Sequence, residues 1–356
     1  MILPSLPPEA SLLAVLLLLM TAGVSVVDGE QLQRFREIRP GMGSTFEIIL
    51  YAPDEQTAQR ALDAAFARIE QLNGVFSDYD SESEAGRLSH AAPMPEAIPV
   101  SDDMFAVLDY STRLSRETDG GFDVTVGPIS RLWRRARRQK QLPAAQRLQE
   151  ALASVGYRHL ELDIDGRKAR LAVAGMRLDF GGVAVGFAVD EALKVLNRQG
   201  LTRALVNGSG DIVLGDPPPG ETGWRIGVAP LEPDQPPSRL LRLAHCGVST
   251  SGDAWQYVEI DGRRYSHIVD PQTGLGLTTR SSVTVIAADG MAADALATAV
   301  SVLGAERGLT LVERTRKAAC LIVRIEDEKP QVIESAEWKR HEIPVPPRTD
   351  EAPPVP

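Results

Sequence analysis

The chain has 356 residues, of which 43% are hydrophobic, and this is enough for one large folded domain or two ordinary ones. Its formal net charge at pH 7 is -10. Since binding to phosphate backbones needs a clear basic excess, the charge excludes non-specific nucleic-acid binding and favours a small molecule or a protein as partner.

Residues 1–28 form the first distinct segment. Residues 12–27 are an apolar run that Asp28 closes, and the run is shorter than the roughly 20 residues of a membrane-spanning helix. The pattern is typical of an export signal, although no Lys or Arg precedes it, and an uncleaved N-terminal anchor is the alternative. No cysteine follows the run, which excludes a lipid-modified N-terminus of the bacterial lipoprotein kind. We therefore expect an exported protein, either periplasmic or anchored to the outer face of the inner membrane.

The rest of the chain predicts helices and strands in irregular order. Apolar residues predict a strand over 45–51 and recur at helical spacing over 58–72. Ser101 is a candidate N-cap for a second helix, which should end near Thr118. A third helix is predicted over 143–155, and further strands over 160–164, 169–173, 204–207, 224–229, 256–260, 282–287 and 320–325. This mixture favours an α+β fold over a doubly wound parallel sheet. The proline-rich residues 344–356 predict a disordered tail, which leaves 33–340 for the folded domain.

Two compositional features allow both a structural and a functional interpretation. Cys246 and Cys320 lack metal-ligand spacing and have apolar neighbours, so they predict two buried thiols rather than a disulfide or a zinc site. Six cations lie between Arg131 and Lys140, and they could attract an anionic surface or partner. We interpret them as the solvated face of a helix beside Trp133.

Asp294 and Thr298 are candidate metal ligands. Their i, i+4 spacing puts a carboxylate and a hydroxyl on one face of a helix. Oxygen ligands of this kind suit Mg²⁺, which takes few ligands from a protein and completes its octahedron with water and substrate phosphate. The alternative is an acidic first-turn residue followed by a core threonine.

Two glycine-rich turns are candidate ligand loops. Leu178-Asp-Phe-Gly-Gly182 joins a strand to a helix that begins near Val183, and the backbone N–H groups of such a helix start bind phosphate well. The glycine spacing is not that of the dinucleotide fingerprint. Gly208-Ser-Gly-Asp211 follows a strand, and there a plain turn and a ligand loop are equally good interpretations.

His267 is the only histidine inside a dense motif, Tyr265-Ser-His-Ile-Val-Asp-Pro-Gln-Thr-Gly274. Imidazole titrates near neutrality, so His267 is a candidate proton acceptor or phosphate contact. Asp253, in the Ser251-Gly-Asp253 turn, is the rival base or an orienting group.

The motifs, taken in order, resemble the FAD:protein FMN transferases, the ApbE-type flavin transferases. The resemblance covers about residues 38 to 315 and includes Gly41-Met-Gly-Ser-Thr45, the acidic loop after Phe76, Gly121-Phe-Asp-Val-Thr-Val-Gly-Pro128 and Ala297-Thr298. It implies an ApbE-like, T-fold-like arrangement of mixed sheets and packed helices, with a flavin site in the cleft between subregions. The implied reaction is the attack of a Thr or Ser hydroxyl on the FMN phosphorus of FAD with release of AMP. The implied partners are FAD, Mg²⁺ and an acceptor protein, for which we expect a membrane redox subunit; a homodimer stays open.

The resemblance also implies roles for particular residues. Met42, Tyr79, Gly121, Phe122, Asp123, Asp179, Val185 and Ile268 stand where the family contacts the flavin or adenosine. Gly182, through its carbonyl, joins Asp294 and Thr298 as a metal ligand. The catalytic candidates are His267 and Asp253.

Two departures from the family pattern bear on activity. Ala184-Val185-Gly186-Phe187 stands where the family has Ala-Lys-Gly-Tyr, so an apolar group replaces a cation. The glycine pair before the acid is changed to Gly208-Ser209-Gly210-Asp211. Since a charge-assisted contact contributes about 1.5 to 3 kcal/mol, its loss predicts transfer slower by about ten- to a hundredfold or more. The alternative function is a flavin-binding or FAD-hydrolysing relative that lost the transferase activity through Val185.

Overall fold

The computed structural model describes residues 26–27, 30–231, 235–252 and 256–345. The predicted export segment, apart from Val26 and Val27, therefore lies outside the described residues. So do Asp253 and positions 346–356 of the proline-rich tail.

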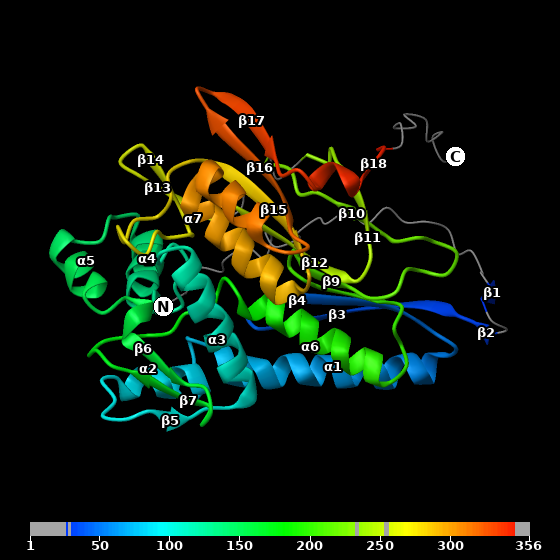
Figure 1. The fold of residues 1–356 in the computed structure, drawn as a ribbon, viewed down its shortest axis with the longest axis horizontal. Helices are drawn as coiled ribbons and strands as arrows, with labels where there is room; N and C mark the ends of the chain where they lie inside the picture. Colours follow the sequence, from blue (N-terminus) through cyan, green and yellow to red (C-terminus); the bar gives the residue numbers. More distant parts are fainter. Residues whose placement is uncertain (1–25, 28–29, 232–234, 253–255, 346–356) are drawn as a thin grey trace, which may run out of the picture.

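An eight-stranded sheet forms the centre of the fold (Figure 1). Each pair of neighbouring strands is antiparallel, which agrees with the predicted α+β class. In spatial order the strands are β17 (Lys329–Glu334), β16 (Ala319–Glu326), β15 (Ser281–Ala287), β12 (Cys246–Gly252), β9 (Asp211–Leu214), β8 (Ala204–Gly208), β4 (Ser44–Ala52) and β3 (Gln33–Gly41).

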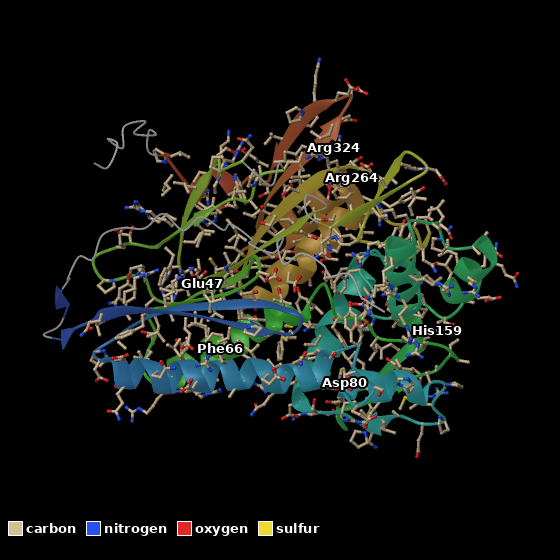
Figure 2. The ribbon with its side chains drawn as sticks, turned by 180° about the vertical axis from the view of Figure 1, so that it is seen from behind. Glu47, Phe66, Asp80, His159, Arg264 and Arg324 are labelled. Atoms are coloured by element: carbon tan, nitrogen blue, oxygen red, sulfur yellow. The ribbon has the colours of Figure 1, made fainter. Side chains whose placement is uncertain are left out.

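The two faces of this sheet are covered differently. Side chains alternate along a strand, so Phe46, Ile48 and Leu50 of β4 face one hydrophobic core while Ile49 faces another. Three helices cover the first face: α1 (Glu55–Phe76), α6 (Ala184–Arg198) and α7 (Gly290–Arg314). A small sheet covers the second: β10 (Trp224–Gly227), β11 (Leu240–Leu243) and β18 (Glu342–Ile343). In the view from behind, Phe66 of α1 lies beneath β3, and the guanidinium of Arg39 sits 4.6 Å from the centre of its ring (Figure 2).

The helical end of the molecule is built from segments between α1 and α6. It contains α2 (Glu84–Ala91), α3 (Asp102–Glu117), α4 (Gly127–Gln139), α5 (Ala145–Leu152) and the sheet β5 (Ile98–Pro99), β7 (Lys168–Leu171) and β6 (Leu160–Asp163). A hairpin of β13 (Tyr257–Ile260) and β14 (Arg263–Ser266) packs on α4, where the rings of Trp133 and Tyr265 lie 5.2 Å apart. A short pair, β1 (Val26–Val27) and β2 (Glu30–Gln31), precedes β3.

Most of the elements predicted from the sequence are present, with altered ends. Ser101 caps α3 through a bond from the Met104 N–H, and Thr118 is the C-cap of the same helix, as predicted. The third predicted helix is shorter, because α5 ends at Leu152. The sequence predicts a helix around Asp294 and Thr298 only, whereas α7 extends from Gly290 to Arg314.

The cysteines and α7 have ordinary structural roles. Cys246 is half-buried and Cys320 is buried, both are free thiols, and burial raises the pKa of each to about 12. Among the described residues, α7 alone has the length and hydropathy of a membrane-spanning helix, but it packs on the central sheet and on α6, as a core helix does.

Candidate functional site

A cavity of about 780 Å³ opens where α4, α6 and α7 meet the ends of β8, β9 and β12. We call it the large cavity. Its volume is within the range of small-molecule sites. It brings together every predicted site residue except Asp253, which lies outside the described residues: Met42, Tyr79, Gly121, Phe122, Asp123, Asp179, Gly182, Val185, His267, Ile268, Asp294 and Thr298.

Close packing of two helices positions Asp294. A Cβ on Gly186 would lie 2.3 Å from the Gly290 carbonyl oxygen and 2.7 Å from Asp294 Cβ, so only glycine allows α6 and α7 to approach this closely. The approach lets the Gly186 N–H donate to Asp294 Oδ2 at 3.1 Å. The glycine of the Ala-Val-Gly-Phe segment therefore fixes the carboxylate that the sequence predicts as a metal ligand.

The other two predicted ligands lie beside Asp294. A Cβ on Gly182 would be 2.8 Å from Thr298 Oγ1, so the backbone of Gly182 lies against the threonine hydroxyl. Thr298 follows Asp294 by one turn of α7, as the i, i+4 spacing predicts. The described residues contain no cluster of three or more His, Cys, Asp or Glu side chains that could hold a metal, so a metal at this place would depend on the hydroxyl and carbonyl oxygens as well.

Asp211 is a second acid at this end of the cavity, half-buried, for which the sequence alone leaves a plain turn and a ligand loop open. It lines the large cavity and accepts a hydrogen bond from the Ser249 hydroxyl at 2.5 Å. Burial raises the pKa of Asp211 to about 6. Burial first, and the nearby Asp211 carboxylate second, raise the pKa of Asp294 well above its ordinary value. Two carboxylates that oppose each other's ionisation form a place where a cation would be stabilised.

Asp190 positions the start of α7. Its two carboxylate oxygens accept from the N–H groups of Gly290 and Met291, at 2.7 and 2.8 Å. Burial raises the pKa of Asp190 to about 7, against the lowering effect of these two bonds. Sequence reasoning gave no role to Asp190, because its partners lie a hundred residues further along the chain.

The glycine-rich turn before α6 offers fewer amide donors than its sequence predicts. The N–H of Gly181 donates to Asp179, the N–H groups of Val183 and Ala184 donate to the Phe180 carbonyl, and that of Gly186 donates to Asp294. These donors are already used within the fold. The turn therefore has few backbone N–H groups left to bind a phosphate, contrary to what its sequence predicts.

Arg134 on α4 corrects the interpretation of the cationic segment. The segment is not only a solvated face, because Arg134 lines the large cavity and pairs with Asp78 at 2.5 Å and Asp179 at 3.1 Å. Its guanidinium also lies 4.2 Å from the centre of the exposed Tyr79 ring. Arg134 thus connects the acidic loop that carries Tyr79 to the turn that carries Asp179. Arg135 and Lys140, by contrast, are exposed as expected.

Asp123 lines the cavity but uses its carboxylate inside the fold. Oδ1 accepts from the N–H and hydroxyl of Thr125, at 2.8 and 2.7 Å, and Oδ2 accepts from the Tyr157 N–H at 2.7 Å. Burial raises the pKa of Asp123. This carboxylate orders the segment Gly121–Val126 and is not directed at a ligand.

His267 is at the rim of the cavity, before β-bridge residue Val269. Its Nδ1 lies 3.1 Å from the Gln256 carbonyl oxygen. A carbonyl only accepts, so Nδ1 is the donor in this bond, and a proton taken up by a neutral ring would go to Nε2.

Val185 and the turn Gly208–Asp211, the two departures from the family pattern, are in contact in the structure. A Cβ on Gly208 would lie 2.6 Å from Val185 Cγ1, so Val185 packs directly on the start of the altered turn. Ser209, at φ 55°, bonds through its hydroxyl with Ser44 and with the backbone of Thr45. The altered turn is therefore tied to the start of β4 rather than left as a flexible loop.

Comparison with known proteins places this chain among flavin transferases. A family model described as the ApbE family matches residues 42–322. A Vibrio cholerae protein named FAD:protein FMN transferase is 33% identical over 297 residues, which are 81% of this chain and 87% of the relative. A Haemophilus influenzae protein of the same name is 30% identical over 302 residues, 80% and 85% of the two chains.

Solved structures give the same result. The flavin transferase ApbE from Vibrio cholerae aligns with a TM-score of 0.78 at 28% identity, covering 87% of this chain and 99% of the other. The apo form of the Pseudomonas stutzeri flavinyl transferase ApbE aligns with a TM-score of 0.76 at 31% identity, covering 88% and 98%.

Proposed function

The chain belongs to the ApbE family of flavin transferases, and from this premise we propose that it moves FMN from FAD to a Thr or Ser hydroxyl of an acceptor protein, with Mg²⁺ as its metal and AMP as the second product. The observation that carries the proposal is the single large cavity around which the family motifs gather. Its acidic end contains Asp211, Asp294 and Thr298, and its rim contains His267.

The donor set supports Mg²⁺ as the metal. Asp294 would bind it through a carboxylate oxygen, Thr298 through its hydroxyl and Gly182 through its carbonyl, all hard oxygen ligands of the kind Mg²⁺ prefers. The raised pKa of Asp294 agrees with a place that a cation normally occupies. When bound, Mg²⁺ supplies positive charge to the phosphate oxygens on which negative charge builds up during transfer.

The protein's own residues then bind FAD and move one proton. Tyr79, stacked on Arg134, presents an exposed aromatic face to the cavity for a flat ring system. The acceptor hydroxyl attacks the FMN phosphorus, the bond between this phosphorus and the AMP oxygen breaks, and the hydroxyl proton goes to His267 Nε2. Asp253 is the second candidate for the proton or for orienting the hydroxyl.

We further propose that the protein is exported and acts at or beyond the membrane on a membrane redox subunit, on the basis of the apolar residues 12–27. The wall of the large cavity includes residues of α4 and the residues that flank the β13–β14 hairpin, and we expect an acceptor polypeptide to contact these segments.

A second candidate function rests on Val185. This residue puts an apolar side chain where the family has a lysine, and it packs on Gly208 at the acidic end of the cavity. A protein that binds FAD, or hydrolyses it slowly, without transferring FMN would fit this arrangement.

One experiment separates the two candidates. The purified protein is incubated with FAD, Mg²⁺ and a peptide that carries Thr, and mass spectrometry detects AMP and flavin on the peptide. We expect both products, and we expect Asp294→Ala to abolish both. FAD binding without flavinylated peptide would contradict the transferase and support the second candidate.

His267 is tested through the pH profile of transfer. His267→Ala should lower kcat by about 10²–10⁴-fold, the usual contribution of a general base. If His267 is the base, the acidic limb of the kcat profile should disappear in the variant. An unchanged limb with a uniformly lower rate would assign proton transfer to another group, with Asp253→Asn as the next variant.

A further inference from the structure

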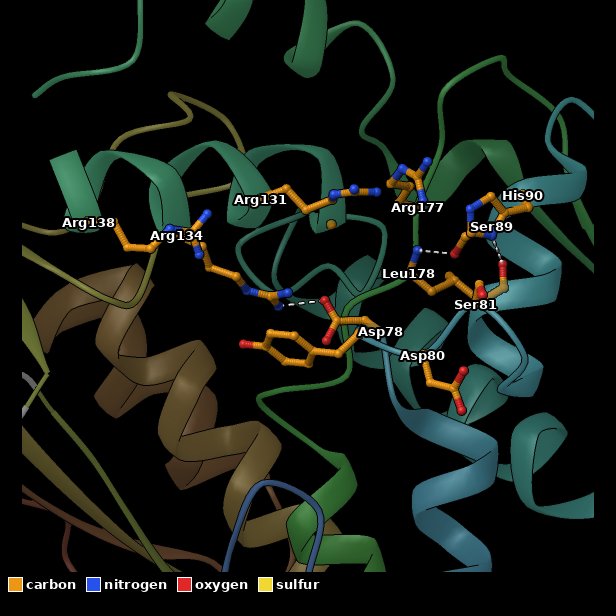
Figure 3. A pocket seen from close by; sticks show the side chains of 13 residues that line it. Asp78, Asp80, Ser81, Ser89, His90, Arg131, Arg134, Arg138, Arg177 and Leu178 are labelled. Atoms are coloured by element: carbon orange, nitrogen blue, oxygen red, sulfur yellow. Dashed lines mark hydrogen bonds and ion pairs between the residues drawn. The ribbon is translucent and has the colours of Figure 1, made fainter. Parts of the chain in front are cut away.

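A second cavity, of about 340 Å³, lies beyond the Tyr79–Arg134 stack (Figure 3). We call it the small cavity. It shares Asp78, Tyr79 and Arg134 with the large cavity, and it is otherwise lined by residues of the loop before α2, of α2 and α4, and by Arg177 and Leu178. None of the site residues predicted for flavin transfer lies in it apart from Tyr79.

Two arginines meet in the small cavity without an acid between them. Figure 3 shows the side chain of Arg131 extending from α4 toward Arg177. Within the part of the chain that the structure describes, no carboxylate pairs with the side chain of either residue. Burial first, and the charge of Arg131 second, lower the pKa of Arg177. The fold thus keeps two like charges close together, an arrangement that an anion between them would relieve.

The charge of the small cavity is positive although the chain is acidic. Four arginines line it, Arg131, Arg134, Arg138 and Arg177, and two carboxylates, Asp78 and Asp80, so the formal charge is 4 − 2 = +2. Asp78 is used by Arg134, at 2.5 Å. Asp80 accepts from the Glu82 N–H at 2.8 Å and pairs with none of the arginines in the described residues. Once Arg134 and Asp78 are paired, the remaining positive charges are those of Arg131, Arg138 and Arg177, and Asp80 offsets one of the three.

The charge and the donors together point to a phosphate group. A carboxylate carries one negative charge, whereas a phosphate monoester carries about −1.5 to −2 at pH 7 and matches the excess of two. Guanidinium groups donate in pairs to tetrahedral oxyanions, and two of them can hold one phosphate from both sides. The volume exceeds that of a bare ion and lies at the small end of ligand sites, so there is room for a small organic group.

We propose that the small cavity is a phosphate-binding site, distinct from the large cavity, that binds a small phosphate monoester between Arg131 and Arg177. Two further polar side chains, Ser89 and His90, complete its wall. The Ser89 hydroxyl accepts from the Leu178 N–H at 3.0 Å, and His90 Nδ1 donates to the Gly86 carbonyl at 2.7 Å, so both hold the wall in shape. This site does not depend on the transferase activity proposed above.

Binding of inorganic phosphate and of glycerol phosphate tests the proposal. Titration calorimetry at low salt and without Mg²⁺ is run on the native protein, Arg131→Gln, Arg177→Gln and the control Arg135→Gln. Arg135 is on the same helix and is exposed like Arg131, but it bonds with Gln139 and does not line the cavity. We expect each cavity variant to weaken binding by about tenfold or more, and the control to bind as the native protein does. Equal affinity in all four proteins would overturn the proposal.

Three further measurements identify where the anion binds and which chemical group is recognised. Asp294→Asn should bind both probes with native affinity, and a loss there would mean that the anion occupies the metal end of the large cavity, which also overturns the proposal. Vesicles containing phosphatidylglycerol should not compete with glycerol phosphate, and competition that requires Arg131 and Arg177 would make a lipid headgroup the ligand instead. Arg177→Lys, which keeps the charge but not the paired donors, should bind more weakly than native protein and more tightly than Arg177→Gln. An Arg177→Lys affinity no better than that of Arg177→Gln would contradict a role for charge.

Discussion

The large and small cavities share Asp78, Tyr79 and Arg134, yet their far ends carry opposite charges. At one end the carboxylates of Asp211 and Asp294 lie together, and at the other the guanidinium groups of Arg131 and Arg177 face each other. Arg134 in the shared wall, by contrast, is neutralised by Asp78 and Asp179.

The contrast between the two ends indicates where the protein needs a bound ion or ligand to balance its charges. Opposite charges side by side, as in the shared wall, stabilise a fold without a ligand. Like charges gathered without partners destabilise a fold until a counter-ion binds, and more strongly where they are buried, as at the acidic end, than where they are partly exposed, as at the arginine end. A bound cation would therefore stabilise the acidic end, and a bound anion would stabilise the arginine end.

The largest effect is expected on activity when a carboxylate at the acidic end is removed. Asp294→Asn keeps the shape of the side chain and an acceptor for the Gly186 N–H, but it removes the charge. Mg²⁺-dependent AMP release should fall by about 10²–10³-fold, as when a preorganised electrostatic contact to the reacting phosphate is lost. Without Mg²⁺ the variant should be at least as stable to heat as the native protein, because a buried charge has gone.

Asp63→Asn, an exposed acid on α1, is the matched control and should change neither activity nor stability by more than a small amount. Lower stability of Asp294→Asn in the absence of metal would show that the carboxylate belongs to the fold and not to a cation site.

The next effect concerns the pH dependence of stability through Asp190. Below its ordinary pKa of 3.8 the carboxyl is neutral in both states and contributes nothing. Between 3.8 and about 7 the unfolded chain releases the proton while the folded protein keeps it, so stability falls as the pH rises; above about 7 the loss is constant. The loss is at most about 4 kcal/mol, since one pKa unit is about 1.4 kcal/mol.

Asp190→Asn should therefore flatten the fall of the free energy of unfolding between pH 4 and pH 7, measured by urea unfolding in the absence of Mg²⁺. The remaining fall in the variant would come from Asp211 and Asp294. Parallel pH curves for the variant and the native protein would refute a raised pKa at Asp190.

A smaller effect is expected from adding a cation to the acidic end. Val185→Lys restores the family's charge next to Asp211 and Asp294, and it should raise kcat/KM for FAD by about tenfold, equivalent to one charge-assisted bond. Val185→Met, similar in length but uncharged, is the control. If Val185→Met speeds the reaction as much, side-chain reach and not charge limits the native enzyme.

The smallest effect is expected at the arginine end in the absence of ligand. Arg177→Gln relieves the repulsion with Arg131 and should raise the free energy of unfolding by about 0.5 kcal/mol at low salt, because both groups are partly exposed to solvent. Salt should remove the gain. A gain that persists in high salt would have a cause other than charge, such as better packing of the amide.

Much of the site was predictable because its motifs are local. The i, i+4 spacing of Asp294 and Thr298 follows from helix geometry alone, and the hydroxyl of Ser101 caps α3 as its sequence indicates. The resemblance gives the residues expected to contact the flavin, and the cavity lining includes all of them.

The remaining features required the tertiary structure. Asp211 reaches the acidic end only because β9 pairs beside β12, and Gly186 directs its N–H to Asp294 only because Gly290 allows the helices to touch. Likewise, nothing local distinguishes Arg131 from Arg135: both are exposed, yet Arg131 lines the small cavity with Arg177 and Arg135 does not.

Sequence pattern alone predicts the α+β class, the family and the chemical types of the site residues, because periodicity, capping and motif order are properties of neighbouring positions. Which charges lie together and which are neutralised follows from the three-dimensional fold. Burial and Coulomb interactions depend on distance in space, and the chain brings residues a hundred positions apart into contact.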